Sequence, residues 1–548
     1  MVSLLSSCSG SSGGSGPPAP QVTALVKDIH TKSAVRNSLP RQLVRIGATV
    51  YFVATTGPHG TEIWKTDGSD AGTVVVKDIV PGSVSSFPDG LTVVGNTLYF
   101  SAFGPTAGRE LYKTDGTTAG TVLVKDIKPG CDGSSPRNLT AGGNTLYFAA
   151  ADDDNGRELW KSDGTAAGTV MVKDIDPRVM SGSPQSSFPS NMAFVNSTLF
   201  FNASTKTTGA ELWKTDGSAA GTLMVADIRP GVAASDPINL RAFKSKVFFA
   251  ADDGSSGFEL WSSDGTTTGT SRVQDIQPGL FGSRPAGLTL LGSTLLFAAT
   301  GSQGNELWKT DGTSKGTVLV RDILTGSGGS SPGRLTVVGN TLYFAAAGKQ
   351  GRELWKSDAT TTGTVLVKDI NTTVAGAGSS PVWLTAISGT ECVFAADNGT
   401  SGVELWKSDG TATGTQLLAD FYPGTDPENG NKPFSSSPAD LVWSGHAVLF
   451  SARDGQVGRE LFKSFGTAGE TLLVKNLQPE SGSSSLPTQM IAFRGAVYFV
   501  ANDGNGVGGH GFELWRTDGT TAGTLLFRDI RPGPKSSLPA GFTVVGNT

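Results

Sequence analysis

Cysteine and histidine are scarce in this chain of 548 residues, which has three cysteines and four histidines. Cys8, Cys131 and Cys392 lack the spacing of a metal site, and three cysteines cannot pair completely. A disulfide between Cys131 and Cys392 would join distant parts of the chain, so we expect two isolated small side chains. Because the histidines are scattered as well, the sequence predicts no histidine or cysteine metal centre.

Long hydrophobic runs and an excess of either charge are also missing. No apolar run approaches the roughly 20 residues that a membrane-spanning helix needs, which argues against a transmembrane protein. The 43 basic and 48 acidic residues are evenly spread and give a net charge of -5, so no footprint for nucleic acid is predicted. Six methionines against 74 glycines are typical of short strands joined by tight turns.

One motif is repeated along the chain, and most other residues belong to the segments that separate its copies. Its clearest copy is Glu158–Thr165, followed by Ala-Gly-Thr and then by Val-Lys-Asp-Ile. Successive copies are 48, 48, 53, 48, 47, 47, 51, 56 and 53 residues apart, a period that indicates a repeat architecture. The ten copies begin at Glu62, Glu110, Glu158, Glu211, Glu259, Glu306, Glu353, Glu404, Glu460 and Glu513.

A single repeat reads as four short antiparallel strands without helical periodicity. In the third repeat we expect strands at 136–142, 145–150, 158–161 and 170–175, separated by turn residues such as Gly143-Asn144. Four strands in about 48 residues is the unit of a β-propeller blade. The predicted fold is therefore an all-β propeller whose blades stack face to face, because one blade buries too little apolar surface to fold alone.

The number of repeats exceeds the usual four to eight blades. We favour one large or incompletely closed ring of ten complete repeats and a partial terminal blade, with two smaller rings or an open superhelical array as alternatives. Residues 24–29 form an isolated copy of a fourth strand, and 536–548 open an eleventh blade. By its own repeats the chain stops about 25 residues short of closing as eleven blades.

A residue that recurs in every blade is expected to have a structural role, in the turn of its own blade or in the contact with the next one. A catalytic site would need its residues at one place only. We expect each motif Glu to be a partly buried hydrogen-bond acceptor balanced by Lys or Arg, and each Asp to accept N–H bonds in its own turn. The predicted structural residues are Glu62, Trp64, Asp67, Glu110, Asp115, Glu158, Trp160, Asp163, Glu211, Trp213, Asp216, Glu259, Trp261, Asp264, Glu306, Trp308, Asp311, Glu353, Trp355, Asp358, Glu404, Trp406, Asp409, Glu460, Glu513, Trp515 and Asp518.

These residues resemble the ELWxxDGT repeat family, found in predicted surface and secreted proteins of bacteria. The resemblance covers about residues 25–548 and implies location and architecture more than activity. The Ser162–Thr165 turn also resembles the Asp-box of sialidase-type propellers, although its spacing differs and the closing aromatic is absent. From that likeness only the structural role of the Asp carries over.

The amino terminus resembles a bacterial lipobox, in which Cys8 would be the lipidated residue. Residues 9–20 are rich in Ser, Gly and Pro, as in a flexible tether, so residues 1–20 form a lipobox-like start and 21–548 the repeat domain. Residues 1–5 lack the basic region and apolar core of a signal peptide, which leaves a chance cysteine as the alternative. Either way a secreted or cell-surface protein is predicted.

Two places could carry a ligand. The loops at Asp152–Asp154, Asp252–Gly254 and Asn502–Gly504 have carboxylates suited to Ca²⁺, although solvated turns are the favoured interpretation and no cofactor is predicted. Irregular insertions, which carry specificity on rigid scaffolds, occur at 178–188, 372–379, 425–437 and 505–510.

The sequence favours a non-enzymatic surface scaffold or adhesin that binds a protein or polysaccharide through blade loops. No nucleophile elbow or phosphate-binding loop is present, and Arg109, Arg157, Arg352 and Arg459 are expected on the blade surface rather than over one pocket. The alternatives are a propeller hydrolase acting on glycans, and a structural array that self-associates through its exposed terminal blades.

Overall fold

The computed structural model describes residues 41–46, 49–56, 59–66, 74–180, 182–443, 445–454, 459–467, 470–475, 485–493, 495–503, 510–528 and 536. Five predictions lie outside the described residues: the tether at 1–20 with Cys8, the isolated strand at 24–29, the turn residue Asp67, most of the insertion at 505–510, and the eleventh blade apart from Ser536.

The described chain contains ten four-stranded antiparallel sheets, which we number as blades one to ten in chain order. The first five blades consist of β1 (Arg41–Ile46), β2 (Thr49–Thr56), β3 (Gly60–Thr66) and β4 (Val74–Lys77); β5 (Asp89–Val94), β6 (Thr97–Gly104), β7 (Gly108–Thr114) and β8 (Val122–Lys125); β9 (Arg137–Gly142), β10 (Thr145–Asp152), β11 (Gly156–Ser162) and β12 (Val170–Lys173); β15 (Ser190–Val195), β16 (Thr198–Thr205), β17 (Gly209–Thr215) and β18 (Leu223–Ala226); and β19 (Ile238–Phe243), β20 (Lys246–Asp252), β21 (Phe258–Ser263) and β22 (Ser271–Gln274).

The last five blades consist of β23 (Ala286–Leu291), β24 (Thr294–Gly301), β25 (Gly304–Thr310) and β26 (Val318–Arg321); β27 (Gly333–Val338), β28 (Thr341–Gly348), β29 (Gly351–Ser357) and β30 (Val365–Lys368); β31 (Val382–Ala386), β32 (Cys392–Asp397), β33 (Val403–Ser408) and β34 (Gln416–Ala419); β37 (Ala439–Trp443), β38 (Val448–Arg453), β39 (Arg459–Ser464) and β40 (Thr471–Lys475); and β41 (Thr488–Phe493), β42 (Ala496–Asn502), β43 (Phe512–Thr517) and β44 (Leu525–Arg528). Two short ribbons, β13–β14 (Val179–Met180, Ser183–Pro184) and β35–β36 (Thr425–Asp426, Lys432–Pro433), lie between blades.

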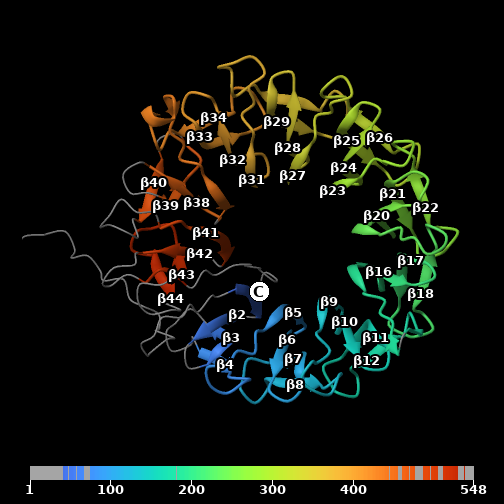
Figure 1. Ribbon diagram of the computed structural model, residues 1–548. Helices are drawn as coiled ribbons and strands as arrows, with labels where there is room; N and C mark the ends of the chain where they lie inside the picture. Colours follow the sequence, from blue (N-terminus) through green and yellow to red (C-terminus); the bar gives the residue numbers. More distant parts are fainter. Residues whose placement is uncertain are drawn as a thin grey trace, which may run out of the picture.

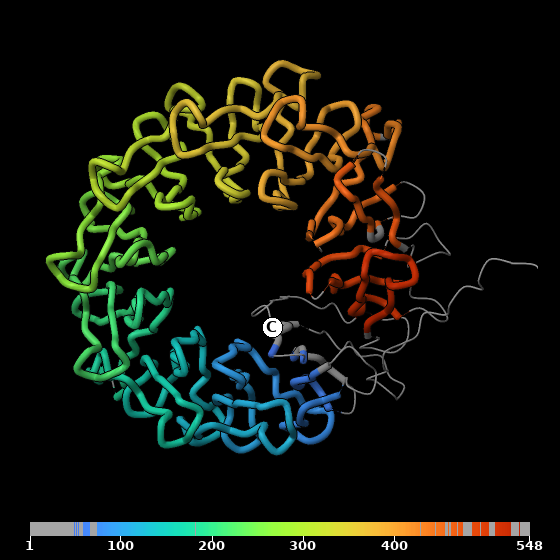
Figure 2. The backbone as a smooth tube through the Cα atoms, turned by 180° about the vertical axis from the view of Figure 1, so that it is seen from behind, coloured from blue at the N-terminus to red at the C-terminus, as the bar shows by residue number. Residues whose placement is uncertain are grey.

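The ten blades follow one another around a single centre (Figures 1 and 2). The innermost strands of successive blades lie against each other, from β1 against β5 through to β37 against β41. The predicted all-β propeller with four-stranded blades is therefore confirmed, and the described blades follow one ring-shaped path rather than two smaller rings. The first and last blades lie at the two ends of this path.

Strand alternation divides each blade between its two neighbours. In the third blade Trp160 packs with Val94 and Ile127 of the second blade, whereas Leu159 packs with Leu199 and Phe201 of the fourth. Each face of the sheet thus belongs to a separate interblade core, as the alternation predicted. The strands match the expected pattern, although β12 ends at Lys173 rather than at residue 175.

In five of the ten blades a basic side chain links the outermost strand to the next blade. Lys125 Nζ donates to the Thr169 carbonyl oxygen at 2.9 Å and lies 5.7 Å from the centroid of the Trp160 ring. The motif Trp is thus covered by a cation of the preceding blade. Equivalent bonds join Lys77 to Thr121, Lys173 to Thr222, Arg321 to Thr364 and Lys368 to Thr415.

The helical content is one short turn, the 3-10 helix Pro427–Asn429, within the described residues. Over that same part of the chain, no helix is long and apolar enough to cross a membrane.

Candidate functional site

The two faces of the ring carry different loops. The connector that leads from one blade to the next runs beside the hairpin between the second and third strands, since Ser135 N donates to Arg109 O at 2.8 Å. Connectors and these hairpins together form what we call the loop face. The Asp turns lie on the opposite face with the hairpins between first and second strands, where Lys244 Nζ donates to Asp311 O at 2.6 Å.

The motif Glu holds both ends of the connector. Glu158 is fully buried, and its Oε2 accepts from Ile175 N at 3.0 Å and from Ser187 Oγ at 2.5 Å. Its Oε1 accepts from Ser187 N at 2.9 Å. Because Ile175 begins the connector and Ser187 ends it, one carboxyl group fixes the path from the third blade to the fourth. The same Glu–Ser pair is formed by Glu62 and Ser86, Glu110 and Ser134, Glu211 and Ser235, Glu259 and Ser283, Glu306 and Ser330, Glu353 and Ser379, and Glu404 and Ser436.

The expectation that a Lys or Arg balances each Glu is wrong for these eight residues. Their hydrogen-bond donors are backbone N–H groups and a serine hydroxyl, and no salt bridge in the described part of the chain involves them. Neutral donors suffice here because burial shifts the acid toward its uncharged form. Glu460 lies in β39 opposite Ala452, and Glu513 is buried in β43.

Burial changes the acidity of these groups. Desolvation raises the pKa of Glu158 to about 8, while hydrogen bonds from Ser187 and Ile175 act in the opposite direction. The pKa values of Glu62, Glu211 and Glu404 are raised to about 7 for the same reason. These acids titrate near neutrality, but they lie within separate blades rather than converging on one site.

The Trp and Asp of the motif are placed as structural residues. Trp160 is buried, and its indole ring packs against the preceding blade. Asp163 is exposed, and its Oδ1 accepts from the backbone N and from Oγ1 of Thr165, both at 2.8 Å. These two bonds lower the pKa of Asp163. The equivalent contact with the residue two positions on is made by Asp115, Asp216, Asp264, Asp311, Asp358, Asp409 and Asp518.

The sequence places the four arginines that precede a motif Glu on the blade surface. In the structure their side chains also form hydrogen bonds to backbone carbonyl groups. Arg157 donates to Ser135 O at 2.7 Å and to Ala149 O at 3.4 Å. Burial lowers the pKa of Arg157, and the charge of Arg137 lowers it further. Similar carbonyl bonds are made by Arg109, Arg352 and Arg459, so these side chains hold the inward-leading end of the connector.

The acidic loops use their carboxylates within the protein. Asp152 accepts from Asn155 N at 2.6 Å, and Asp153 pairs with Lys128 at 3.2 Å. Asp252 and Asp253 pair with Arg229 and Arg272, and Asp503 is bonded to His510. Within the described residues there is no group of three or more His, Cys, Asp or Glu side chains placed to hold a metal ion. Cys131 and Cys392 are free thiols, and burial raises the pKa of Cys392 to about 12.

The insertions share one location that sequence reasoning did not find. The clamping Ser follows its Glu by 24 residues in most blades, but by 29 at Ser187, 26 at Ser379 and 32 at Ser436. The extra residues therefore extend from connectors whose ends stay fixed, and all three insertions lie on the loop face. Counting residues between each Glu and the next connector Ser would have revealed this.

Exposed apolar side chains also gather on the connectors. Of the sixteen large hydrophobic side chains that are exposed in the described chain, nine belong to connectors. Among them Phe281 is 83% exposed, Val232 78% and Leu280 73%. Apolar groups in these surface loops make no core contact, so they are available to a partner. The nine are Val84, Phe87, Val179, Met180, Phe188, Val232, Leu280, Phe281 and Val374.

Comparison with known proteins finds distant structural similarities alone. No protein-family model matches the chain, and no curated protein matches it. Among solved structures it is similar to puromycin hydrolase (14% identity, 67% of this chain and 58% of that chain, TM-score 0.30) and to a prolyl endopeptidase (11%, 71% and 56%, TM-score 0.34). It is also similar to the β-propeller domain of the Trilobed protease from Pyrococcus furiosus, described as having an open velcro topology (12%, 70% and 98%, TM-score 0.27). The chain spans less than two thirds of the two peptidases, and the fold assignment rests on its own blades.

Proposed function

We propose that this protein is a non-enzymatic scaffold or adhesin that binds a protein or polysaccharide through the loop face of its ring. The motif residues are occupied in holding blades and connectors together, which leaves the connectors as the variable surface. The observation that carries the proposal is the concentration of exposed apolar side chains and of all three described insertions on that one face.

The proposed location is the cell surface or the extracellular space. The supporting features are the resemblance to a bacterial surface repeat family and the lipobox-like position of Cys8, which would make the protein an outer-membrane lipoprotein. Contact with a membrane would then occur only through the lipid. The even charge distribution supports neither nucleic acid nor an anionic membrane surface as a partner.

A binding experiment with matched variants tests the loop face. The full chain would be immobilised and exposed to purified bacterial surface polysaccharides and surface proteins, with a variant carrying Val232→Ser, Leu280→Ser and Phe281→Ser. The control carries Val170→Ser, Leu223→Ser and Val318→Ser, which are also exposed but lie on outermost strands. We expect the connector variant to lose binding and the control to keep it.

Two outcomes would count against the proposal. Equal binding by both variants would place the contact elsewhere on the ring. Release of new reducing ends from a bound polysaccharide would favour the alternative of a glycan-acting hydrolase. The second alternative, an array assembled through terminal blades, predicts concentration-dependent growth of the particle in light scattering.

A further inference from the structure

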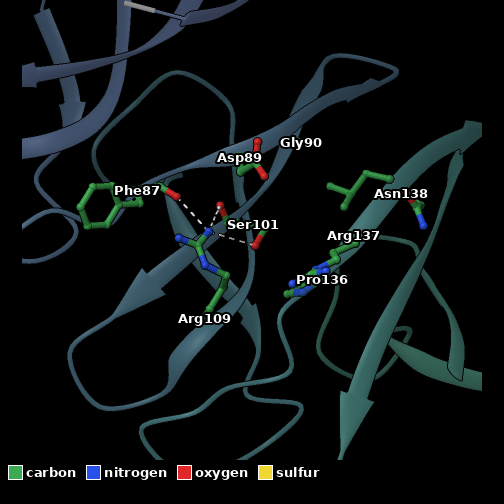
Figure 3. Close-up of a pocket in the computed structure, with 9 residues that line it drawn as sticks. Phe87, Asp89, Gly90, Ser101, Arg109, Pro136, Arg137 and Asn138 are labelled. Carbon is green, nitrogen blue, oxygen red and sulfur yellow. Dashed lines mark hydrogen bonds between the residues drawn. The ribbon is translucent and has the colours of Figure 1, made fainter. Parts of the chain in front are cut away.

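A cleft of about 640 Å³ lies between the second and third blades (Figure 3). Its volume lies within the range of about 300–1,000 Å³ that is typical of small-molecule sites. The lining comes from the connector ends and the first residues of the inner strands, so the cleft lies at the inner rim of the loop face. It is lined by Phe87, Asp89, Gly90, Ser101, Arg109, Pro136, Arg137, Asn138 and Leu139.

Two guanidinium groups from different blades lie on the two sides of this cleft. Arg109 of β7 is held in place because it donates to Phe87 O at 2.9 Å and to Ser101 Oγ at 3.3 Å. Arg137 of β9 is exposed, and its side chain forms no hydrogen bond or salt bridge among the described residues. Asp89 offsets part of the positive charge at Arg109.

A third arginine, Arg157, adds to the positive charge near this pair. Burial lowers the pKa values of Arg109 and Arg157, and the charge of Arg137 lowers both further, so Arg137 adds its charge to that of two other arginines. Like charges held this close repel each other unless an anion enters between them. A bound carboxylate or sulfate would relieve this repulsion and could accept paired N–H bonds from the guanidinium groups.

This arrangement does not recur at the other blade boundaries where an Arg precedes the motif Glu and both positions are compared. The residue at the position of Arg137 is Ser190 in the blade after Arg157, and Val382 in the blade after Arg352. A feature found at one position of a repeated framework is not required by the framework itself. The arginine pair is therefore a property of this cleft rather than of the blade.

The remaining lining includes the small residues Gly90, Ser101 and Pro136. Phe87 contributes its carbonyl oxygen beside Arg109, while its ring, which is 52% exposed, points away from Arg109 (Figure 3). Asn138 Nδ2 donates to Pro189 O at 2.9 Å, so its amide is turned toward the fourth blade. The two guanidinium groups are therefore the feature of this cleft that points to an anionic ligand.

We propose that this cleft binds one residue of an acidic saccharide, with its anionic group held between Arg109 and Arg137. The proposal rests on the proposed function and specifies the class of polysaccharide. The anionic group is a uronic acid carboxylate or a sulfate ester, and the two sources are separated by the choice of ligand.

The test measures binding of the full chain to an oligogalacturonate, to a sulfated oligosaccharide and to a neutral malto-oligosaccharide of the same length. We expect one of the two anionic ligands to bind, and binding to weaken as salt is added. Arg137→Gln should lower that affinity by about tenfold or more, since a charge-assisted hydrogen bond is lost. Its unfolding midpoint should stay unchanged, because Arg137 has no bond to lose in the described structure.

Arg334→Gln is the matched control. Arg334 is exposed on β27 beside Arg352, as Arg137 is beside Arg157, and its loss changes the net charge equally. An equal effect of both substitutions on affinity, or equal binding of the neutral ligand, would overturn the proposal that this cleft binds an acidic saccharide. If the chain binds an acidic polymer that Arg137→Gln does not weaken, this inference fails while the proposed function stands. If the chain binds no surface polymer or protein at all, both fail.

Discussion

The Lys125 ammonium of one blade donates to the Thr169 carbonyl oxygen of the next at 2.9 Å, so adjacent sheets are joined at their outer edges as well as through their cores. The same Lys lies over the Trp160 ring, which couples the Val-Lys-Asp-Ile segment of one repeat to the Glu-Leu-Trp segment of the following one. The two most regular parts of the motif therefore stabilise a blade boundary rather than a single blade.

Removing this ammonium should weaken the boundary. We expect Lys125→Met to lower the free energy of unfolding by about 1.5–3 kcal/mol, the usual contribution of a hydrogen bond to a charged group. Urea unfolding monitored by tryptophan fluorescence measures the change. Lys349→Met is the control, because Lys349 is exposed and makes no hydrogen bond in the described part of the chain; equal losses would show that the contact is unimportant.

The Glu158 clamp should be sensitive to truncation. Glu158→Ala leaves the N–H groups of Ile175 and Ser187 and the Ser187 hydroxyl buried without an acceptor. Because each buried unsatisfied group costs about 1–3 kcal/mol, the loss should exceed about 3 kcal/mol. Limited proteolysis should show earlier cleavage in the connector at 178–186.

Glu158→Gln keeps one acceptor oxygen and should lie between the wild type and the alanine variant. Asp153→Ala removes an exposed carboxylate of the same blade and should leave stability nearly unchanged. An equal rate of connector cleavage in all three variants would mean that the clamp does not hold the connector.

Stability should fall as the pH rises through neutrality. The folded-state pKa values of Glu62, Glu158, Glu211 and Glu404 are raised to about 7 or 8 from 4.5. A raised pKa contributes stability that is complete below the unfolded value and is lost as the pH passes the folded value. We therefore expect a lower urea midpoint at pH 8.5 than at pH 5.5, and a smaller difference between the two in Glu158→Gln.

The turn aspartates make stability fall as the pH is lowered, which is opposite to the effect of the buried glutamates. The pKa of Asp163 is lowered from 3.8, so its bonds to Thr165 contribute above that value and are lost in acid. Stability should therefore be greatest at about pH 4 to 4.5, between the unfolded values of the two acids, with losses on both sides. A midpoint that rises steadily from pH 5.5 to 8.5 would contradict the acidities of the buried glutamates.

One blade lacks the turn carboxylate and provides a test by restoration. Phe465 replaces the Asp, and the Thr467 hydroxyl bonds to Glu470 instead. Phe465→Asp should supply an acceptor for Thr467 N and stabilise the protein by about 1 kcal/mol. Phe465→Ala removes the ring without adding an acceptor, so a gain of the same size there would show that the exposed ring alone had been unfavourable.

The blade was predictable because its information is local. Turn residues such as Gly143-Asn144 and alternation on strands such as 170–173 lie within a few positions, and the repeat supplies ten copies of the same pattern. The partner of Glu158 was not predictable in this way, because Ser187 is 29 residues away and belongs to the start of the next blade. The cation expected beside each Glu was wrong because local sequence does not show that backbone N–H groups converge there.

The cleft of Arg109 and Arg137 escaped prediction for a related reason. The two residues are ordinary within their own repeats, and their proximity arises only when two blades are stacked. The common position of the insertions on the loop face likewise becomes visible only when the blades are stacked. Features within a blade follow from periodicity, whereas features between blades require the ring.

The fixed ends of each connector also have a consequence for how such a chain can change. With Glu and Ser closing the base, lengthening the enclosed segment from 24 to 32 residues adds only about 0.3 kcal/mol of loop-closure entropy. New sequence can therefore be accepted at any one connector without rebuilding the adjoining cores. Eight such positions around one rim make the ring a frame into which foreign peptides could be grafted one at a time.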